Sequence, residues 1–471
     1  MEIIGRKAEI KILEEKIASN QSEFVAVYGR RRVGKTFLIR QVFEKKFTLQ
    51  LTGVANANLQ IQLEAFNRSL ASQQPRYKRK QARNWAEAFD LLKKVIAKSK
   101  QKKKVIFIDE LPWFDTLHSG FVQQLEHFWN SWASARKDVM LIVCGSAASW
   151  MLNKLIKNKG GLHNRVTQRI KLEPFTLIEC EDYAKYKGLK IDRYQLLQLY
   201  MTLGGIPYYW NGISKGKSVA QIIQHLCFDK NGLLVDEFQV LYQSIFYKAE
   251  RHEAIVFALA RKDKGLTRQE IADISGLANG GGLTRLLEEL EESGFVRRYA
   301  QIGKKKRDSL YQLCDVFTLF HLKFMDKNST NEKNYWLKKF NSPQYRAWSG
   351  YAFEQVCLWH VEQIKNALGI SGIETEVSSW RSSGSIDGAQ IDLVIDRKDG
   401  VVNLCEMKFS IGEFVVDKRY QKVLQTKVNT FASESAINKT YHLVLVTTFG
   451  LKENTHTGNI QQCVTMNNLF D

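Results

Sequence analysis

The first 150 residues contain three short runs in which nearly every residue is apolar. These runs cover residues 24–28, 105–108 and 140–144, and the first is soon followed by a helical stretch at 37–40. A run that is apolar at every position predicts a strand buried on both faces, as in a parallel sheet covered by helices. The pattern therefore predicts an α/β unit with a parallel sheet at the N-terminus.

The middle of the chain has helical periodicity followed by two short strands. Thr267 and Glu270 have the spacing of a capping box, which starts a helix. One face of a second helix carries four leucines, Leu283, Leu286, Leu287 and Leu290. The stretches 295–299 and 309–313 read as strands that flank the basic turn 303–307. Two helices followed by a basic hairpin predict a winged helix-turn-helix.

The last 130 residues combine strand and helix patterns again. After a helix around residue 353, the segments 390–395 and 401–408 read as two strands joined by the hairpin signal Asp399-Gly400. A helix at 413–432 and a strand at 442–447 follow. These elements predict a second α/β unit at the C-terminus.

The same patterns divide the chain into three domains, at residues 1–215, 216–325 and 340–471. Residues 216–255 read as helical and connecting, and the polar stretch 326–345 reads as a linker. The chain has 471 residues, of which 44% are hydrophobic and 25% charged, and only 5 are proline. This composition is ordinary for folded domains and excludes a disordered or proline-rich architecture.

The charge of the chain is strongly positive. It has 69 lysines and arginines against 49 acidic residues, a formal net charge of +20. Twelve basic residues fall within 76–104, with only Glu87 and Asp90 opposing them. Such a surplus favours a polyanionic partner, because displacing counterions from phosphates drives binding. We expect a nucleic acid, DNA in preference to RNA; a basic enzyme without a nucleic-acid role is the alternative.

Several features indicate a cytoplasmic protein without a membrane partner. The seven cysteines are dispersed and lack the spacing of a zinc or redox motif, which favours reduced thiols in a reducing compartment. The charged start of the chain does not fit a signal peptide. The longest uncharged apolar stretch, 139–152, is shorter than the ~20 residues that a spanning helix needs.

The strand at 24–28 runs directly into a phosphate-binding loop pattern, glycine, four residues, then Gly-Lys-Thr. The residues expected around the phosphates are Gly29, Arg30, Arg31, Arg32, Val33, Gly34, Lys35 and Thr36. The glycines let backbone N–H groups converge on the phosphates, and the helix N-terminus adds its positive end. Lys35 is expected to reach the β- and γ-phosphates of ATP, and the Thr36 hydroxyl to bind Mg²⁺.

Polar residues also follow the other two predicted strands. Asp109 and Glu110 end the strand at 105–108, where ligands bind in open α/β sheets. Asp109 is expected to orient Mg²⁺, and Glu110 to polarise the attacking water. Ser146 follows the strand at 140–144 and is a candidate sensor of the γ-phosphate. Arg165 is a candidate for stabilising the transferred phosphoryl group, within one chain or across a subunit boundary; a structural role is the alternative.

As a set, these motifs resemble the archaeal-type P-loop ATPases of the AAA/STAND superclass. The matching residues are 5–9 with Leu13, the loop 29–36, the strand 105–110, Cys144-Gly145-Ser146, Arg165 before 172–175, and Gly204 to Tyr208. The resemblance covers about the first half of the chain. It implies an ATPase core with a small helical lid, and it implies that Gly205 and Pro207 lie against the adenine.

The role of the predicted winged helix stays open between two interpretations. Its basic turn, Lys304 to Arg307, suits contact with DNA phosphates. Its second helix carries Arg285 but four glutamates, which is unfavourable for lying along a phosphate backbone. The competing interpretation is a lid that senses the nucleotide state, as the winged helices of STAND-type ATPases do, and the two roles are compatible.

The two strands of the C-terminal unit carry the PD-(D/E)XK nuclease pattern, Asp392 followed by Glu406-x-Lys408. A hairpin sets the two carboxylates on neighbouring strands, where they are expected to bind Mg²⁺, and alternation places Lys408 on the same face as Glu406. Lys408 is then expected to position the attacking water, and Glu354 on the preceding helix to complete the metal shell.

This unit resembles the restriction-endonuclease-like domain at the C-terminus of many archaeal-type ATPases. The fold class implied for the whole chain is α/β: a P-loop parallel-sheet ATPase core with a helical lid, a winged helix-turn-helix, and an α/β restriction-endonuclease-like domain. The sequence thus predicts an ATP-hydrolysing, DNA-interacting protein with a candidate metal-dependent nuclease domain. The alternative is an ATP-controlled regulatory switch whose other domains only bind DNA or protein. A homo-oligomer and an RNA-directed system also stay open.

Overall fold

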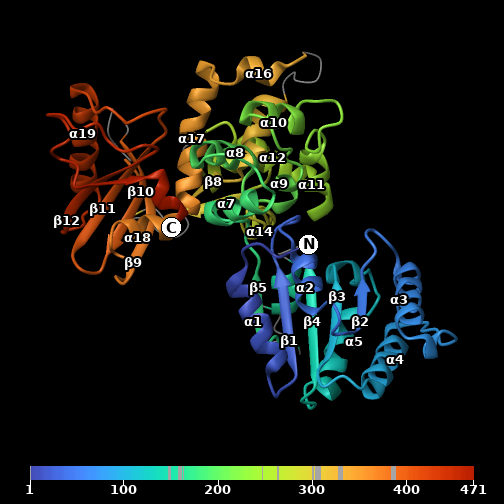
Figure 1. The fold of residues 1–471 in the computed structure, drawn as a ribbon. Helices are drawn as coiled ribbons and strands as arrows, with labels where there is room; N and C mark the ends of the chain where they lie inside the picture. Colours follow the sequence, from blue (N-terminus) through green and yellow to red (C-terminus); the bar gives the residue numbers. More distant parts are fainter. Residues whose placement is uncertain are drawn as a thin grey trace. The chain divides into compact units, whose positions relative to one another are not determined.

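The computed structural model describes residues 2–146, 150–156, 162, 164–246, 248–262, 265–299, 302, 309–326, 333–382 and 389–471 (Figure 1). The chain forms two compact units, Met1–Pro174 and Phe175–Asp471. Each unit has its own sheets and its own buried core. The segment 175–215, which the sequence prediction joined to the ATPase core, belongs to the second unit.

The N-terminal unit contains a five-stranded parallel sheet in the order β2-β3-β4-β1-β5. Its strands are β1 (Glu23–Tyr28), β2 (Phe47–Thr52), β3 (Lys104–Asp109), β4 (Val139–Gly145) and β5 (Gln168–Lys171). The three predicted apolar runs are β1, β3 and β4, which lie side by side in the middle of the sheet. The parallel sheet predicted from those runs is therefore confirmed.

Helices surround this sheet (Figure 1). They are α1 (Lys7–Ala18), α2 (Lys35–Phe43), α3 (Leu59–Gln73), α4 (Trp85–Lys98) and α5 (Phe121–Phe128). Shorter helices accompany them, the 3₁₀-helices η1 (Pro75–Tyr77) and η2 (Leu111–Phe114) and the π-helices η3 (Trp129–Ala133) and η4 (Met151–Ile156). Phe66 on α3, Trp85 on α4 and Phe121 on α5 belong to one hydrophobic core. Every second residue of the strands, such as Ile108, belongs to the same core. The residues between these alternate positions are buried as well, as expected for a parallel sheet covered on both faces.

The second unit begins with a group of helices. They are α7 (Leu177–Tyr186), α8 (Arg193–Leu203), α9 (Pro207–Asn211), α10 (Val219–Cys227), α11 (Glu237–Ile245) and α12 (Glu250–Leu259). Three of them start with a capping box, at Thr176, Asp192 and Ser218. Each box satisfies backbone N–H groups that the first helical turn leaves without partners, and so it fixes where the helix begins.

Two helices and a small antiparallel sheet follow. The elements are β6 (Leu266–Thr267), α13 (Arg268–Ser275), α14 (Gly281–Glu292), β7 (Val296–Tyr299) and β8 (Leu310–Leu313), with strand order β6-β8-β7. The predicted capping box is confirmed, since Glu270 N–H donates to Thr267 and Thr267 N–H donates to Glu270. The four predicted leucines are the buried residues of α14. The basic turn between β7 and β8, with Lys304, Lys305, Lys306 and Arg307, lies outside the described residues.

The next segment is helical and rich in buried aromatic side chains. Its elements are α15 (Val316–Phe320), η6 (His321–Met325), α16 (Tyr335–Lys339), α17 (Pro343–Trp359) and α18 (Val361–Ala367). The polar linker expected over 326–345 was wrong in its second half. Trp336 in α16 is fully buried and packs against Phe228, Phe320 and Phe324. Trp336 stands between Tyr335 and Leu337 in a stretch bounded by lysines and asparagines, which is too short to form a periodic pattern, so its burial was not visible in the sequence.

The C-terminal part contains a mixed five-stranded sheet in the order β13-β12-β11-β10-β9. Its elements are β9 (Thr375–Arg381), β10 (Gln390–Arg397), β11 (Val401–Lys408), α19 (Lys418–Glu434), β12 (Thr440–Thr447), β13 (Gln462–Thr465) and η7 (Met466–Phe470). β10 and β11 form the predicted antiparallel hairpin, whose turn has Gly400 at a φ of 87°. β11, β12 and β13 are parallel. Over the described part of the chain, no helix combines the length and apolarity needed to span a bilayer.

Candidate nucleotide site and candidate metal site

The phosphate-binding loop connects β1 to α2 through residues with left-handed backbone conformation. Gly29 has a φ of 140°, Arg32 a φ of 68° and Gly34 a φ of 94°. A Cβ on Gly29 would lie 2.4 Å from the carbonyl oxygen of Leu172, and Leu172 N–H donates to the carbonyl of Tyr28. Position 29 therefore requires a glycine for two reasons, the positive φ and the close approach of the segment at Leu172.

Lys35 lies at the start of α2 and is buried. Its Nζ donates to the carbonyl oxygens of Gly29 at 3.0 Å and Arg30 at 2.8 Å. Burial lowers the pKa of Lys35, and the nearby Glu110 and Asp109 carboxylates oppose that shift. Within the described part of the chain, the Lys35 ammonium group is thus held inside the loop by these two backbone oxygens, and an anionic ligand would be a stronger partner for it.

Thr36 and Asp109 meet between α2 and the end of β3. Thr36 Oγ1 donates to Asp109, at 3.0 Å from Oδ1 and 2.9 Å from Oδ2. Asp109 is only 3% exposed, and burial raises the pKa of this carboxyl. A hydroxyl and a carboxylate are the oxygen ligands that Mg²⁺ prefers, so the two residues fit a Mg²⁺ ion.

Glu110 is held by Ser146 at the neighbouring strand end. The Ser146 hydroxyl donates to Glu110 Oε1 at 3.0 Å, and the Ser146 N–H donates to Oε2 at 3.3 Å. Glu110 itself has a φ of 50°, which is uncommon for a residue with a side chain. The structure thus brings together Lys35, Thr36, Asp109, Glu110 and Ser146, all of them predicted from the sequence.

The arginines of the region differ in exposure. Arg30 is buried, whereas Arg31 and Arg32 are partly exposed. Val33 is buried, and its carbonyl accepts a hydrogen bond from Arg6 at 3.3 Å. Arg165 is exposed in the turn before β5, where its N–H donates to Leu162. No hydrogen bond from its guanidinium to the loop residues occurs within the described ranges.

Gly205 and Pro207 belong to the second compact unit. A Cβ on Gly205 would lie 1.8 Å from the carbonyl oxygen of Phe175, and Phe175 N–H donates to the Gly205 carbonyl at 2.6 Å. Pro207 starts α9, a favourable position for proline. Packing inside this unit therefore accounts for both residues, and their predicted contact with adenine stays a prediction.

In the C-terminal sheet, Asp392 and Glu406 lie on the same face of the hairpin. Leu393 is opposite Cys405 and Val394 opposite Leu404, so the same register sets Asp392 opposite Glu406. Asp392 Oδ2 accepts a hydrogen bond from Met407 N–H at 3.0 Å. Burial raises the pKa of Glu406, and the nearby Asp392 carboxylate raises it further.

Lys408 and Glu354 lie beside these two carboxylates. Lys408 Nζ is 4.0 Å from Glu406 Oε2 and 5.3 Å from the ring centre of Tyr420. Glu354 accepts a hydrogen bond from Gln312 at 3.3 Å. Burial, followed by the Asp392 charge, raises the pKa of Glu354 to about 8. The four residues predicted for this site therefore do come together.

Sequence reasoning missed Lys427 on α19, whose Nζ lies 2.6 Å from Glu406 Oε2. Burial and Asp392 raise the pKa of Glu406 to about 7, while Lys427 and Lys408 act in the opposite direction. Lys427 shares one helical face with three core residues, at spacings of three, four and seven positions: Leu424, Phe431 and Tyr420. A lysine on the apolar face of a predicted helix was the signal that could have revealed it.

Two buried polar atoms of this site have no hydrogen-bond partner among the described residues, Glu406 Oε1 and Tyr420 Oη. An unsatisfied carboxylate oxygen beside a second carboxylate fits a divalent cation. Across the described ranges, no group of three or more His, Cys, Asp or Glu side chains is arranged to hold a metal ion. Asp392 and Glu406, which share a face, are therefore the two carboxylates that would hold the ion, and completion of the metal shell by Glu354 stays a prediction.

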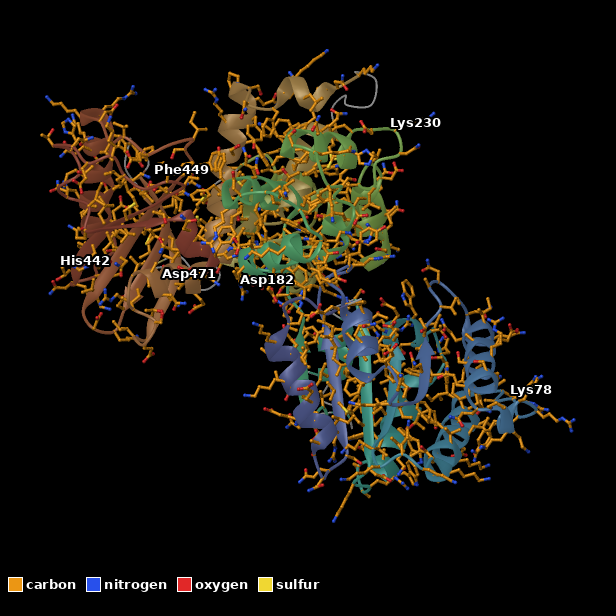
Figure 2. The ribbon with its side chains drawn as sticks, in the orientation of Figure 1. Lys78, Asp182, Lys230, His442, Phe449 and Asp471 are labelled. Atoms are coloured by element: carbon orange, nitrogen blue, oxygen red, sulfur yellow. The ribbon has the colours of Figure 1, made fainter. Side chains whose placement is uncertain are left out.

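A basic segment lies between α3 and α4 of the N-terminal unit. Its exposed side chains are Arg76, Lys78, Arg79, Lys80 and Arg83. Lys78 lies at the rim of this unit, beside the two helices (Figure 2). The only buried residue from 76 to 81 is Tyr77, which anchors the segment in the core of the unit.

Comparison with known proteins identifies an ATPase domain in the N-terminal part of the chain. Residues 3–211 match the family described as an ATPase domain predominantly from Archaea. The uncharacterized protein MJECL04 of Methanocaldococcus jannaschii is 26% identical over 404 residues, which are 83% of each chain. The uncharacterized ATP-binding protein MJ0423 of the same organism is 46% identical over 43 residues, which are 9% of this chain and 73% of that protein.

Solved structures are similar to this chain as well, among them a protein of Pyrococcus abyssi and a protein of Aeropyrum pernix. The Walker-type ATPase PABY2304 of Pyrococcus abyssi is 17% identical, with a TM-score of 0.48 over 67% of this chain and 95% of its own. The ORC2 protein of Aeropyrum pernix is 15% identical, with a TM-score of 0.43 over 72% of this chain and 96% of its own.

Proposed function

Since this chain carries an archaeal-type ATPase domain over residues 3–211, we propose that this domain binds ATP with Mg²⁺ and hydrolyses it. The observation that carries the proposal is the pair formed by Thr36 and Asp109 beside the buried ammonium of Lys35. A hydroxyl, a carboxylate and an ammonium held together at the strand ends suit a metal ion and a polyphosphate.

Each of these residues has a distinct role in the proposed reaction. Lys35 exchanges its two backbone oxygen partners for phosphate oxygens, and Thr36 and Asp109 hold the metal. Bound Mg²⁺ supplies charge neutralisation on the phosphates. Glu110 orients the attacking water and accepts its proton, while Ser146 positions the Glu110 carboxylate. Arg165 is exposed and stays a candidate for stabilising the transferred group in its own chain or in a second copy of a homo-oligomer.

The first test is Lys35→Ala, which removes the ammonium from the loop. ATP affinity should fall by roughly 10- to 100-fold, because each charge-assisted hydrogen bond that is removed contributes about 1.5–3 kcal/mol. Titration calorimetry with a non-hydrolysable ATP analogue measures this decrease directly. Lys45→Ala is the matched control, since Lys45 is exposed just beyond α2. Equal affinity in the Lys35→Ala variant and the wild type would contradict the nucleotide site.

A second activity is favoured by the convergence of Asp392, Glu406 and Lys408. We propose that residues 340–471 form a restriction-endonuclease-like domain that cleaves DNA with a divalent cation. Asp392 and Glu406 hold the cation, which stabilises charge on the phosphate, and Lys408 positions the water. The orphaned Glu406 Oε1 and the shared face of the two carboxylates support this proposal.

The rival proposal is a regulatory switch in which ATP controls domains that only bind DNA or protein. The tight ion pair of Glu406 with Lys427 favours it, because a carboxylate neutralised by a lysine needs no metal. Under this alternative the C-terminal domain binds DNA without cutting it, and cleavage assays decide between the two.

We further propose a cytoplasmic, DNA-interacting protein. The two helices and the three-stranded sheet of residues 266–313 have the element order of a winged helix-turn-helix. The formal charge of +20 and the exposed basic segment 76–83 support a nucleic-acid partner. All seven cysteines are free thiols and six are buried, which supports a reducing compartment.

Salt dependence tests the DNA partner. Replacing Arg76, Lys78, Arg79 and Lys80 with Gln should reduce the slope of log affinity against log salt by roughly one unit for each phosphate that the variant no longer neutralises. Fluorescence anisotropy with duplex DNA at several salt concentrations gives the slope, and single-stranded RNA run in parallel tests the RNA alternative. The matched control replaces four exposed lysines elsewhere in the same unit, Lys7, Lys11, Lys45 and Lys46. Equal slopes in both quadruple variants would show that the segment 76–80 is not part of the DNA interface.

A further inference from the structure

Glu406 in the C-terminal site faces two lysines at different distances. Lys427 Nζ lies 2.6 Å from Glu406 Oε2, whereas Lys408 Nζ lies 4.0 Å from the same oxygen. The nearer lysine comes from α19 and the farther one from β11. Glu406 is 1% exposed, so these contacts are shielded from water. The short contact therefore belongs to a residue outside the Asp392, Glu406 and Lys408 pattern.

The surroundings of Lys427 make it a stronger partner than a surface lysine. The side chains of Leu424 and Phe431, one turn before and after it on α19, are buried. The Lys427 side chain itself is 20% exposed, compared with 32% for Lys408. Its position on the helix face toward the sheet is thus fixed by packing on both sides, and its ammonium group reaches Glu406 without disturbing the helix.

A lysine ammonium and a divalent cation compete for the same carboxylate oxygen. Both are attracted by Glu406 and Asp392, and they repel each other at close range. Mg²⁺ also requires near-ideal oxygen geometry at about 2.0–2.1 Å, which an ammonium group at hydrogen-bond distance of Oε2 obstructs. Glu406 Oε1, by contrast, has no partner in the described part of the chain. A divalent cation therefore meets no hydrogen-bonded partner at Glu406 Oε1 within the described residues, whereas the Lys427 ammonium occupies Glu406 Oε2.

We propose that the Lys427 ammonium competes with the divalent cation for Glu406, so that Lys427 sets the metal affinity of the C-terminal site. The inference rests on the proposed metal site at Asp392 and Glu406. It assigns the control over metal loading to a lysine outside the Asp392, Glu406 and Lys408 pattern, the one nearer to Glu406. The site fills only when the cation concentration is high enough to displace the lysine, or when a bound ligand draws the lysine away.

The test is Mn²⁺ binding to the full chain without nucleotide, measured by titration calorimetry and by the electron paramagnetic resonance signal of free Mn²⁺. Lys427→Met removes the charge and keeps the apolar stem, and it should bind Mn²⁺ about tenfold more tightly than the wild type, or about 1.4 kcal/mol. Lys427→Arg keeps the charge and should bind no more tightly than the wild type. Lys422→Met, an exposed lysine on the same helix, is the matched control and should leave the affinity unchanged.

The variant Glu406→Gln distinguishes Mn²⁺ bound at this site from Mn²⁺ bound elsewhere in the chain. Only the Mn²⁺ binding that is lost in this variant is assigned to the site. Unchanged or weaker Mn²⁺ binding in Lys427→Met, with binding still abolished in Glu406→Gln, would overturn the inference and leave the metal site standing. The inference would also be overturned, with the metal site left standing, if Lys427→Arg increased the Mn²⁺ affinity as much as Lys427→Met. If Glu406→Gln changes nothing in any background, both the metal site and the inference are wrong.

Discussion

Replacement of Glu110 by Gln is expected to leave ATP binding intact and to slow hydrolysis by about a hundredfold or more. A glutamine has nearly the same shape as glutamate, and its carbonyl oxygen still accepts the hydrogen bond that Ser146 Oγ now gives to Glu110 Oε1. The variant lacks the carboxylate that accepts a proton from the attacking water, as well as the acceptor for the longer hydrogen bond from Ser146 N–H. General-base catalysis typically contributes about 10²–10⁴-fold. Single-turnover hydrolysis and binding of an ATP analogue, measured on the same sample, separate the two effects.

The control for this experiment is Glu44→Gln, which changes an exposed glutamate at the end of α2. It should hydrolyse ATP at the wild-type rate. Ser146→Ala is expected to hydrolyse ATP at a rate between those of Glu110→Gln and Glu44→Gln, because it releases the Glu110 carboxylate from its hydrogen bond without removing it. If Glu110→Gln hydrolyses ATP as fast as the wild type, the base lies elsewhere and the role given to Glu110 is wrong.

The second large effect concerns DNA cleavage in the C-terminal domain. With Mg²⁺ or Mn²⁺, the wild type should nick plasmid DNA, and Glu406→Gln should reduce the rate by about a hundredfold or more, since a metal ion supplies several kcal/mol of charge stabilisation and each 1.4 kcal/mol is about tenfold. Gln is preferable to Ala, because its side chain has nearly the same shape as that of Glu and its carbonyl oxygen can still accept a hydrogen bond from the Lys427 ammonium. Gel analysis of supercoiled plasmid measures the rate.

Asp392→Asn should reduce cleavage to a similar degree, whereas Glu413→Gln, an exposed glutamate after β11, should not. Cleavage that persists in both site variants would come from a contaminating nuclease. If the wild type cuts no DNA with either metal but still binds it, the nuclease proposal is wrong and the regulatory switch is the better description.

The sequence was informative wherever chemistry and local structure are encoded by neighbouring residues. The loop from Gly29 to Thr36 follows directly from its spacing, and the apolar run before Asp109 implies a central strand that ends beside it. The same reasoning located the hairpin of β10 and β11, because Asp399-Gly400 separates two strand patterns. The register of that hairpin then determines that Asp392 and Glu406 share a face.

Features that depend on contacts distant in sequence were not predictable in this way. The helical pattern can place Lys427 on the apolar face of α19, but that it meets Glu406 depends on how α19 packs across the sheet, which no local pattern encodes. Trp336 is buried by Phe228, more than 100 positions earlier, and by Phe320 and Phe324, so a polar segment became part of the core. The hydrogen bond between Ser146 and Glu110 joins two strand ends whose order in the sheet had to be known first.

The close packing at Gly29 and at Gly205 has a mechanical consequence for the connection between the two compact units. Leu172 is tied to the start of the phosphate-binding loop, and Phe175 is tied to Gly205 in the other unit. Only Glu173 and Pro174 separate these two anchors, a tether of at most about 11 Å at roughly 3.3–3.6 Å per residue. The segment between the two anchors is thus two residues long, and one of its ends is hydrogen-bonded to the backbone just before the phosphate-binding loop. The chain between the two anchors therefore has almost no slack, and the two anchored backbone segments cannot separate by more than this length without losing one of their hydrogen bonds.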